Sequence, residues 1–184
     1  MFKKILVPVD GSRTSRLGLE EAIKLAKDQR AMLYILHVVD EQGVLQGPSV
    51  SSGMFIDDFL RTMRENGRTI IADAEAIAKK SGVRAKSLMV ENFSGPTADA
   101  IVSQAKKLKA NLIVLGTHGR RGIKRLVMGS DAEGVIRNTP VPVLLMRTAP
   151  VARKTRKRAG KFGKQTSGGR AMPRGSKSIR SAMI

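Results

Sequence analysis

Residues 112–131, LIVLGTHGRRGIKRLVMGSD, join a short apolar run to a segment rich in glycine and positive charge. The first four residues are typical of a buried strand. Four glycines and four Lys or Arg residues follow within residues 116–131. Such a segment is either a surface loop whose glycines only serve turns, or a cradle of backbone amides for an anion. The rest of the chain bears on that choice.

Apolar runs alternate with helical patterns along the chain. The predicted strands are 4–9, 32–39, 85–90, 112–115 and 143–146. The longest helical pattern runs from Ile56 to a predicted C-terminal glycine cap at Gly82. The alternating order predicts an α/β fold, a parallel sheet with helices on both faces. Pro142 indicates that the fifth strand lies at an edge, because proline cannot donate to a ladder.

The position of the glycine-rich segment favours the anion cradle. In parallel α/β sheets, ligands bind beyond the carboxyl ends of the strands, where the strand order reverses. Gly116 follows the fourth strand, and Gly129-Ser130 precede a predicted helix whose positive end suits a phosphate. The cationic residues around the glycines are Arg120, Arg121, Lys124 and Arg125. The spacing is neither a Walker A loop, since no lysine follows Gly129, nor the dinucleotide fingerprint that follows a first strand.

Four segments together resemble the universal stress protein family. They are VPVDGS at 7–12, LHVVD at 36–40, GTHGRRGIKRLVMGS at 116–130 and TPVPVLLMR at 139–147. The resemblance covers residues 1–148 and includes a complete G-x2-G-x9-G-S element, the hallmark of the ATP-binding branch. It implies a five-stranded parallel sheet of order 3-2-1-4-5 and a homodimer formed along the fifth strands. It also implies a cytoplasmic stress-response or signalling module that binds an adenine nucleotide, either ATP or AMP/ADP, with or without Mg²⁺.

The same resemblance assigns roles to individual residues. Asp10 would bind the ribose hydroxyls, and the backbone at Val9 and Val38 would contact adenine. The phosphates would be held by Gly116, Gly119, Gly129 and Ser130. The expected cofactor-binding set is Pro8, Val9, Asp10, Val38, Gly116, Gly119, Arg120, Gly129 and Ser130. Asp131, next to Ser130, either begins the helix or reaches the phosphates through a metal ion.

No catalytic or metal-binding residue is predicted. His37 lies inside a strand, where a packed, hydrogen-bonded histidine is expected, while His118 could contact phosphate or face solvent. The carboxylates of Asp57, Asp58 and Glu65 are expected on a solvated helix face. Slow ATP hydrolysis or autophosphorylation is a property of relatives as a class, but no general base is identified here, so enzymatic activity stays open.

Charge divides the chain into two predicted regions. The net charge is +19, and residues 151–184 hold eleven Lys or Arg and no Asp or Glu. The resemblance implies a nucleotide-binding domain over 1–148, and the charge and low apolar content predict a disordered basic tail over 149–184. The alternative function is DNA or RNA contact through this tail, with the α/β domain as a dimerisation scaffold. A membrane surface is disfavoured, because no apolar helical face accompanies the charges.

The composition excludes further classes of site. The chain has no Cys, which rules out disulfides and thiolate metal sites and fits a reducing cytosol. No segment approaches the length of a membrane span, and the apolar run after Met1 is too short for a signal peptide.

Overall fold

The computed structural model describes residues 1–42, 56–117 and 128–147. The strands are β1 (Lys4–Pro8), β2 (Met32–Asp40), β3 (Ala85–Asn92), β4 (Leu112–Gly116) and β5 (Val143–Met146); the helices are α1 (Arg13–Gln29), α3 (Ile56–Lys80), α4 (Thr97–Leu108) and α5 (Ser130–Asn138). The predicted alternation of strands and helices is confirmed, and the strand ends move by at most two residues. The predicted tail, 149–184, lies outside the described residues.

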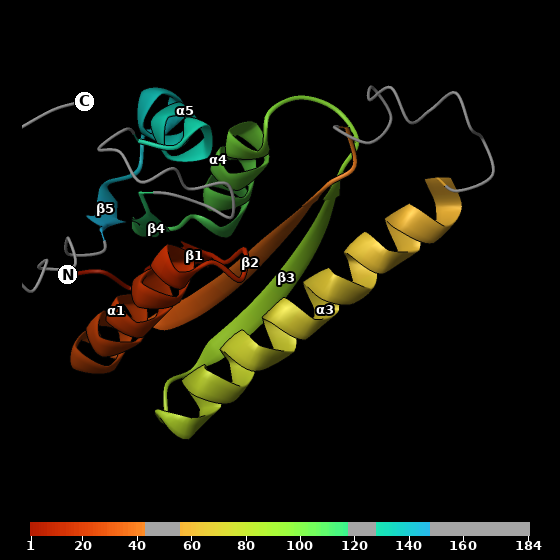
Figure 1. Ribbon diagram of the computed structural model, residues 1–184. Helices are drawn as coiled ribbons and strands as arrows, with labels where there is room; N and C mark the ends of the chain where they lie inside the picture. The colour runs from red at the N-terminus through yellow and green to blue at the C-terminus, as the bar shows by residue number, and fades with distance from the viewer. Residues whose placement is uncertain (43–55, 118–127, 148–184) are drawn as a thin grey trace, which may run out of the picture. The chain divides into compact units, whose positions relative to one another are not determined.

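The five strands form one parallel sheet in the order β3-β2-β1-β4-β5 (Figure 1). This is the order that the family resemblance implied. Strand β1 is central, with β2 on one side and β4 on the other. Strand β5 lies at an edge, as Pro142 predicted. The order reverses at β1, because the chain first builds outward to β3 and then returns to the other side.

Two layers of helices cover the sheet. Helices α1 and α3 pack on the face that carries Ile5, Val7 and Val114, and α4 and α5 pack on the face that carries Leu6 and Ile113 (Figure 1). Successive residues of a strand point to opposite faces, so a strand covered on both sides needs apolar residues throughout. This explains why these strands appear in the sequence as continuous apolar runs.

The helix ends mostly follow the sequence signals. The Ser12 side chain caps α1 by accepting a hydrogen bond from the Ser15 amide. After α3 the chain turns at Gly82, whose φ of +72° confirms the predicted glycine cap. Helix α4 begins at Thr97, with Pro96 at the N-cap position. Among the described residues, no helix is both long and apolar enough to cross a membrane.

The apolar side chains of α3 are only partly buried. Ala74 and Ala78 pack into the core, whereas Phe59 is 53% exposed. Gly67, a weak point by helix propensity, is buried where α3 crosses β2. A β-carbon at Gly67 would stand 2.8 Å from Cδ2 of His37. The glycine therefore lets the helix approach a histidine on the sheet.

Candidate functional site

The candidate site lies where β1 stops and its two neighbours continue. We call the side of the sheet where the strands end its carboxyl edge, and the opposite side its amino edge. Strand β1 ends at Pro8, while β2 continues to Asp40 beyond the residue paired with Pro8, which is Leu36. We call this place at the carboxyl edge, where the strand order reverses, the notch.

The backbone of Val38 faces this notch from the β2 side. Met32 donates to the Lys3 carbonyl and Leu36 accepts from Val9, so the even-numbered residues of β2 hydrogen-bond toward β1. In a parallel sheet, alternate residues of a strand hydrogen-bond to the same neighbouring strand. Val38 is the next even-numbered residue, and β1 has ended before it. This placement is consistent with the adenine contact expected of Val38.

The same alternation makes Gly116 face the notch from the β4 side. Ile113 donates to the Pro142 carbonyl and Thr117 donates to the Met146 carbonyl, both toward β5. Gly116 lies between these odd-numbered residues and so addresses β1. A β-carbon here would stand 2.9 Å from the Thr14 carbonyl carbon and 3.0 Å from the Ser15 amide nitrogen. Only glycine brings β4 this close to the first turn of α1.

Asp10, two residues past the end of β1, is held by a tight turn. Its Oδ1 accepts from the Ser12 amide at 2.9 Å, and its own amide donates to Ser15 Oγ at 3.3 Å. Gly11 between them has a φ of +79°, a conformation that glycine adopts without strain. The carboxylate is thereby oriented by the backbone, before any ligand is considered.

Val9 is fastened to β2 by both of its backbone groups. Its amide donates to the Leu36 carbonyl at 2.8 Å, and its carbonyl oxygen lies 2.7 Å from Nδ1 of His37. A carbonyl only accepts, so Nδ1 carries the proton. His37 is 6% exposed, which confirms the prediction of a packed, hydrogen-bonded histidine. His37 thus joins the end of β1 to α3, whose Gly67 accommodates the ring.

The start of α5 is joined to the end of β4. The Gly129 amide donates to the Thr117 carbonyl at 2.8 Å, which places the two ends of segment 118–127 next to each other. Gly129 is the N-cap of α5, and among the described residues no side chain caps it. Ser130 is exposed at the first helical position. The amides of the first turn therefore point outward from a positive helix end.

The structure thus brings together six of the nine expected site residues in the two regions just described. Pro8, Val9, Asp10, Val38 and Gly116 surround the notch, and Gly129 is hydrogen-bonded to the residue after Gly116. Ser130 follows at the helix start. Gly119 and Arg120 lie outside the described residues, as does His118. The roles of all nine residues stay predictions. The Gly129 amide already donates to the Thr117 carbonyl, and the sequence did not indicate this hydrogen bond.

Comparison with known proteins identifies the family. The family model described as the universal stress protein family matches residues 1–147. This chain belongs to the universal stress protein family.

Two relatives of this universal stress protein illustrate how far the similarity extends. It is 37% identical to universal stress protein MJ0531 of Methanocaldococcus jannaschii over 147 residues, which cover 80% of this chain and 83% of the relative. It is 36% identical to universal stress protein YxiE of Bacillus subtilis over 151 residues, or 80% of this chain and all of the relative. The similarity therefore spans whole family domains.

Solved structures share the fold. The universal stress protein UspA from Lactobacillus plantarum superposes with a TM-score of 0.68 at 25% identity, covering 79% of this chain and 97% of that protein. A universal stress protein in complex with cAMP has a TM-score of 0.56 at 24% identity, covering 80% and 98%. One from Archaeoglobus fulgidus in complex with dAMP has a TM-score of 0.58 at 22% identity, covering 78% and 97%. At these last two identities the likeness establishes the fold alone.

An ion-paired cluster at the carboxyl edge was not foreseen from the sequence. Glu41, which is fully buried just past β2, accepts from Nε and Nη2 of Arg64 at 2.8 and 3.1 Å. Arg64 Nε also lies 3.3 Å from Glu91 at the end of β3. The hydrogen bond to Glu41 raises the pKa of Arg64, helped by the charges of Glu41, Glu91 and Asp57 and opposed by burial. The cluster fastens α3 to the ends of β2 and β3.

The remaining carboxylates form no metal-binding cluster in the described part of the chain. Asp57, Asp58 and Glu65 are exposed on α3, which confirms the expected solvated face. Within residues 1–42, 56–117 and 128–147, no group of three or more His, Asp or Glu residues gathers as a metal site would require. Asp131 occupies the first turn of α5, the helix-start position that the sequence suggested.

Proposed function

We propose that this universal stress protein binds an adenine nucleotide at the notch between β2 and β4. The observation that carries the proposal is the convergence of three different groups on the end of β1. These are the backbone of Val38, the oriented carboxylate of Asp10 and the close-packed Gly116. Fold neighbours in complex with cAMP and dAMP support the choice of an adenine nucleotide.

Each part of a nucleotide has a chemically suitable partner. The Val38 amide and carbonyl can pair with the edge of adenine, because a strand end presents one donor and one acceptor. Asp10 accepts hydrogen bonds from vicinal ribose hydroxyls, and the Ser12 amide keeps the carboxylate from rotating away. The phosphates would lie toward Ser130 and the outward amides of α5, where the helix end favours negative charge. We assign Gly129 to the turn that positions these amides.

We propose ATP as the physiological nucleotide, with AMP or ADP as alternatives. The support for ATP is the complete G-x2-G-x9-G-S element, whose Gly119 and neighbouring Arg120 would enclose the outer phosphates. Asp131 opposes this, since a carboxylate in the first turn of α5 repels a γ-phosphate unless Mg²⁺ lies between them. Nucleotide binding would change the conformation of the glycine-rich segment and so the partners that it binds, as expected of a cytoplasmic signalling module.

The experiment that tests the proposal is mass analysis of the small molecules released by denaturing freshly purified protein. We expect an adenine nucleotide in near-stoichiometric amount. Titration calorimetry on nucleotide-free protein, with AMP, ADP and ATP in the presence and absence of Mg²⁺, then ranks the candidates. If no nucleotide is released and none binds or raises the melting temperature, the proposal is wrong.

We further propose a homodimer and a site of autophosphorylation. A homodimer formed along β5 would cover the exposed edge of the sheet, and sedimentation analysis measures it directly. Slow autophosphorylation would transfer label from ATP to the protein and would be lost in Ser130→Ala if that hydroxyl is the acceptor. Contact between nucleic acid and the tail concerns residues outside those described, and the comparisons lend it no support.

A further inference from the structure

The amino edge of the sheet carries a row of cations, one for each of four neighbouring strands. Arg84 directly precedes β3, Arg30 lies two residues before β2, Lys3 directly precedes β1 and Lys109 lies three residues before β4. All four side chains are exposed. We call them the amino-edge cations. Their order in space follows the strand order rather than the sequence.

Hydrogen bonds between the segments fix this row. The Arg84 guanidinium donates to the Arg30 carbonyl at 3.1 Å, and the Lys3 carbonyl accepts from Met32 at 2.9 Å. The Lys3 amide donates in turn to Oδ1 of Asn111, two residues after Lys109. Neighbouring strands lie about 4.8 Å apart, so the four segments span about 14 Å. The four segments that carry these charges are therefore held side by side at this edge.

These cations have no carboxylate partner among the described residues. The five ion pairs between described residues all involve other cations, in α1, α3 and α5. The segments at this edge, residues 1–3, 27–31, 79–86 and 106–111, contain a single acidic residue, Asp28. Positive potential therefore accumulates here instead of being cancelled locally.

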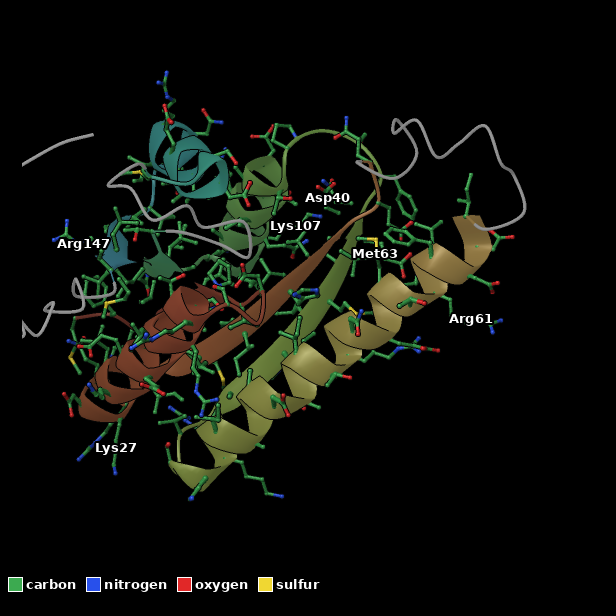
Figure 2. All side chains as sticks on the ribbon, in the orientation of Figure 1. Lys27, Asp40, Arg61, Met63, Lys107 and Arg147 are labelled. Atoms are coloured by element: carbon green, nitrogen blue, oxygen red, sulfur yellow. The ribbon has the colours of Figure 1, made fainter. Side chains whose placement is uncertain are left out.

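Helix ends account for some of the positive charge at this edge but not for the row. Last-turn lysines are Lys27 in α1, Lys79 and Lys80 in α3, and Lys106 and Lys107 in α4. Figure 2 shows Lys27 extending away from the end of α1. Such lysines offset the negative helix end, which amounts to about half a charge for each helix. The amino-edge cations come in addition to this compensation.

Two of the amino-edge cations occupy positions where the backbone favours glycine. Arg30 and Lys109 have φ of 51° and 53°, and they are the non-glycine residues with positive φ in the described part of the chain. Both are left-handed C-caps, a place where glycine is usual. The third helix that ends at this edge, α3, uses Gly82 in the expected way. At both positions a long cationic side chain thus occurs where the backbone conformation favours glycine.

We propose that the amino-edge cations bind the phosphate backbone of duplex DNA without reading its sequence. A duplex carries one negative charge for about every 1.7 Å of its axis, so about eight phosphates lie along 14 Å of duplex, and those on the near side can contact the row. Single strands are recognised by aromatic stacking, and the exposed aromatic side chains of the described residues, Phe59 and Phe93, lie at the start of α3 and after β3, away from this edge. The nucleotide proposed above lies at the opposite edge, and β2 alone separates the two edges by nine residues, about 30 Å.

The test replaces both left-handed cations by glycine in the full-length protein. Arg30→Gly with Lys109→Gly removes two charges from the row and leaves a backbone that glycine adopts more readily, so the melting temperature should not fall. The matched control, Arg16→Gln with Arg68→Gln, removes two charges from exposed positions on α1 and α3. The basic tail is identical in both variants, so it cannot account for a difference between them.

Binding of a labelled duplex of about 20 base pairs is measured by anisotropy between about 50 and 200 mM salt. We expect the glycine variant to bind about tenfold more weakly at the lower salt and to lose about 2 from the slope of log K against log salt, while the control keeps the wild-type slope. Equal losses in both variants would mean that only net charge matters and would overturn the proposal. So would an unchanged slope, or a defect seen with polyglutamate or phosphatidylserine vesicles but not with the duplex. Calorimetry with ATP on the same variants should be unaffected, which separates this result from any failure of the nucleotide site.

Discussion

The two edges of this sheet use polar groups in opposite ways. At the carboxyl edge, Asp10, Ser12 and Ser15 are hydrogen-bonded to one another, and Glu41 is paired with Arg64 in the interior. At the amino edge, exposed cations stand without carboxylate partners among the described residues. A parallel α/β fold places all helix N-termini at the first edge and their C-termini at the second. The first edge can thus bind an anion with backbone amides, whereas the second can do so only with side chains.

This contrast has a consequence for mutation. A site built from backbone depends on close packing and tolerates no added side-chain volume, so changes there should lower stability and binding together. A site built from exposed side chains should lose binding without losing stability. The following substitutions test this distinction in order of the expected effect.

Gly116→Val should have the largest effect. Its side chain would meet the backbone of Thr14 and Ser15, which cannot move without displacing α1, and overpacking of this kind lowers the free energy of unfolding by about 3 kcal/mol. Urea denaturation measures the loss, and calorimetry with the nucleotide should show weaker binding. Gly18 supplies the control, because it lies on the α1 side of the same interface.

A β-carbon at Gly18 would stand 3.7 Å from the Gly116 amide nitrogen, an ordinary contact. Gly18→Ala should therefore leave stability unchanged or raise it, since alanine favours the helix. Equal losses for the two substitutions would show that the interface is tight throughout and that Gly116 holds no special position.

Glu41→Gln should lower the free energy of unfolding by about 2 kcal/mol. The amide keeps the shape of the side chain but replaces a charged acceptor, and hydrogen bonds to charged groups are worth more than neutral ones. Arg64 retains Glu91 as a partner and is 33% exposed, which limits the loss. Glu133→Gln, which removes the exposed partner of Arg137, is the matched control and should change stability far less. Indistinguishable values would mean that the buried pair does not fasten α3 to the sheet.

Asp10→Asn should weaken nucleotide binding about tenfold, which corresponds to about 1.4 kcal/mol, with a smaller change in stability. Oδ1 already accepts from the Ser12 amide, so the asparagine would present an NH2 donor to the ribose hydroxyls where Asp10 presents the acceptor Oδ2. Calorimetry with adenosine nucleotides and with their 2′-deoxy forms makes the assignment specific. The wild type should prefer the ribose form, and the variant should show no preference. A variant that still discriminates between the sugars would remove Asp10 from the site.

The sequence predicted the layers of this fold well because its signals are local. Continuous apolar strands and the glycine cap at Gly82 each follow from a few neighbouring residues. The family resemblance added the strand order, which no local pattern contains. The notch itself could not be predicted, because it depends on which residues of β2 and β4 extend past Pro8 in the register of the sheet.

The features missed by sequence reasoning are those formed between distant segments. Glu41 and Arg64 are separated by 23 positions, and no spacing rule connects them. Helix propensity alone makes Gly67 a weak point of α3, and only the structure shows that His37 lies opposite it. The amino-edge cations are scattered from Lys3 to Lys109 and become a row only through the strand order. In the sequence they appear only as an excess of basic residues before the tail, and the stronger charge of the tail draws attention away from that excess.

Gly82→Ala should have the smallest effect. It measures the free-energy cost of placing a residue with a β-carbon in the left-handed conformation found at the amino edge. No atom lies within 4 Å of the added β-carbon, so the change isolates the left-handed backbone at a φ of +72°. We expect a loss of about 1 kcal/mol in the free energy of unfolding, seen as a lower urea midpoint with an unchanged slope. The reverse changes, Arg30→Gly and Lys109→Gly measured singly, should recover a comparable amount. If they instead destabilise the fold, the two cations stabilise the helix ends at which they lie, and their placement reflects folding rather than an anionic partner.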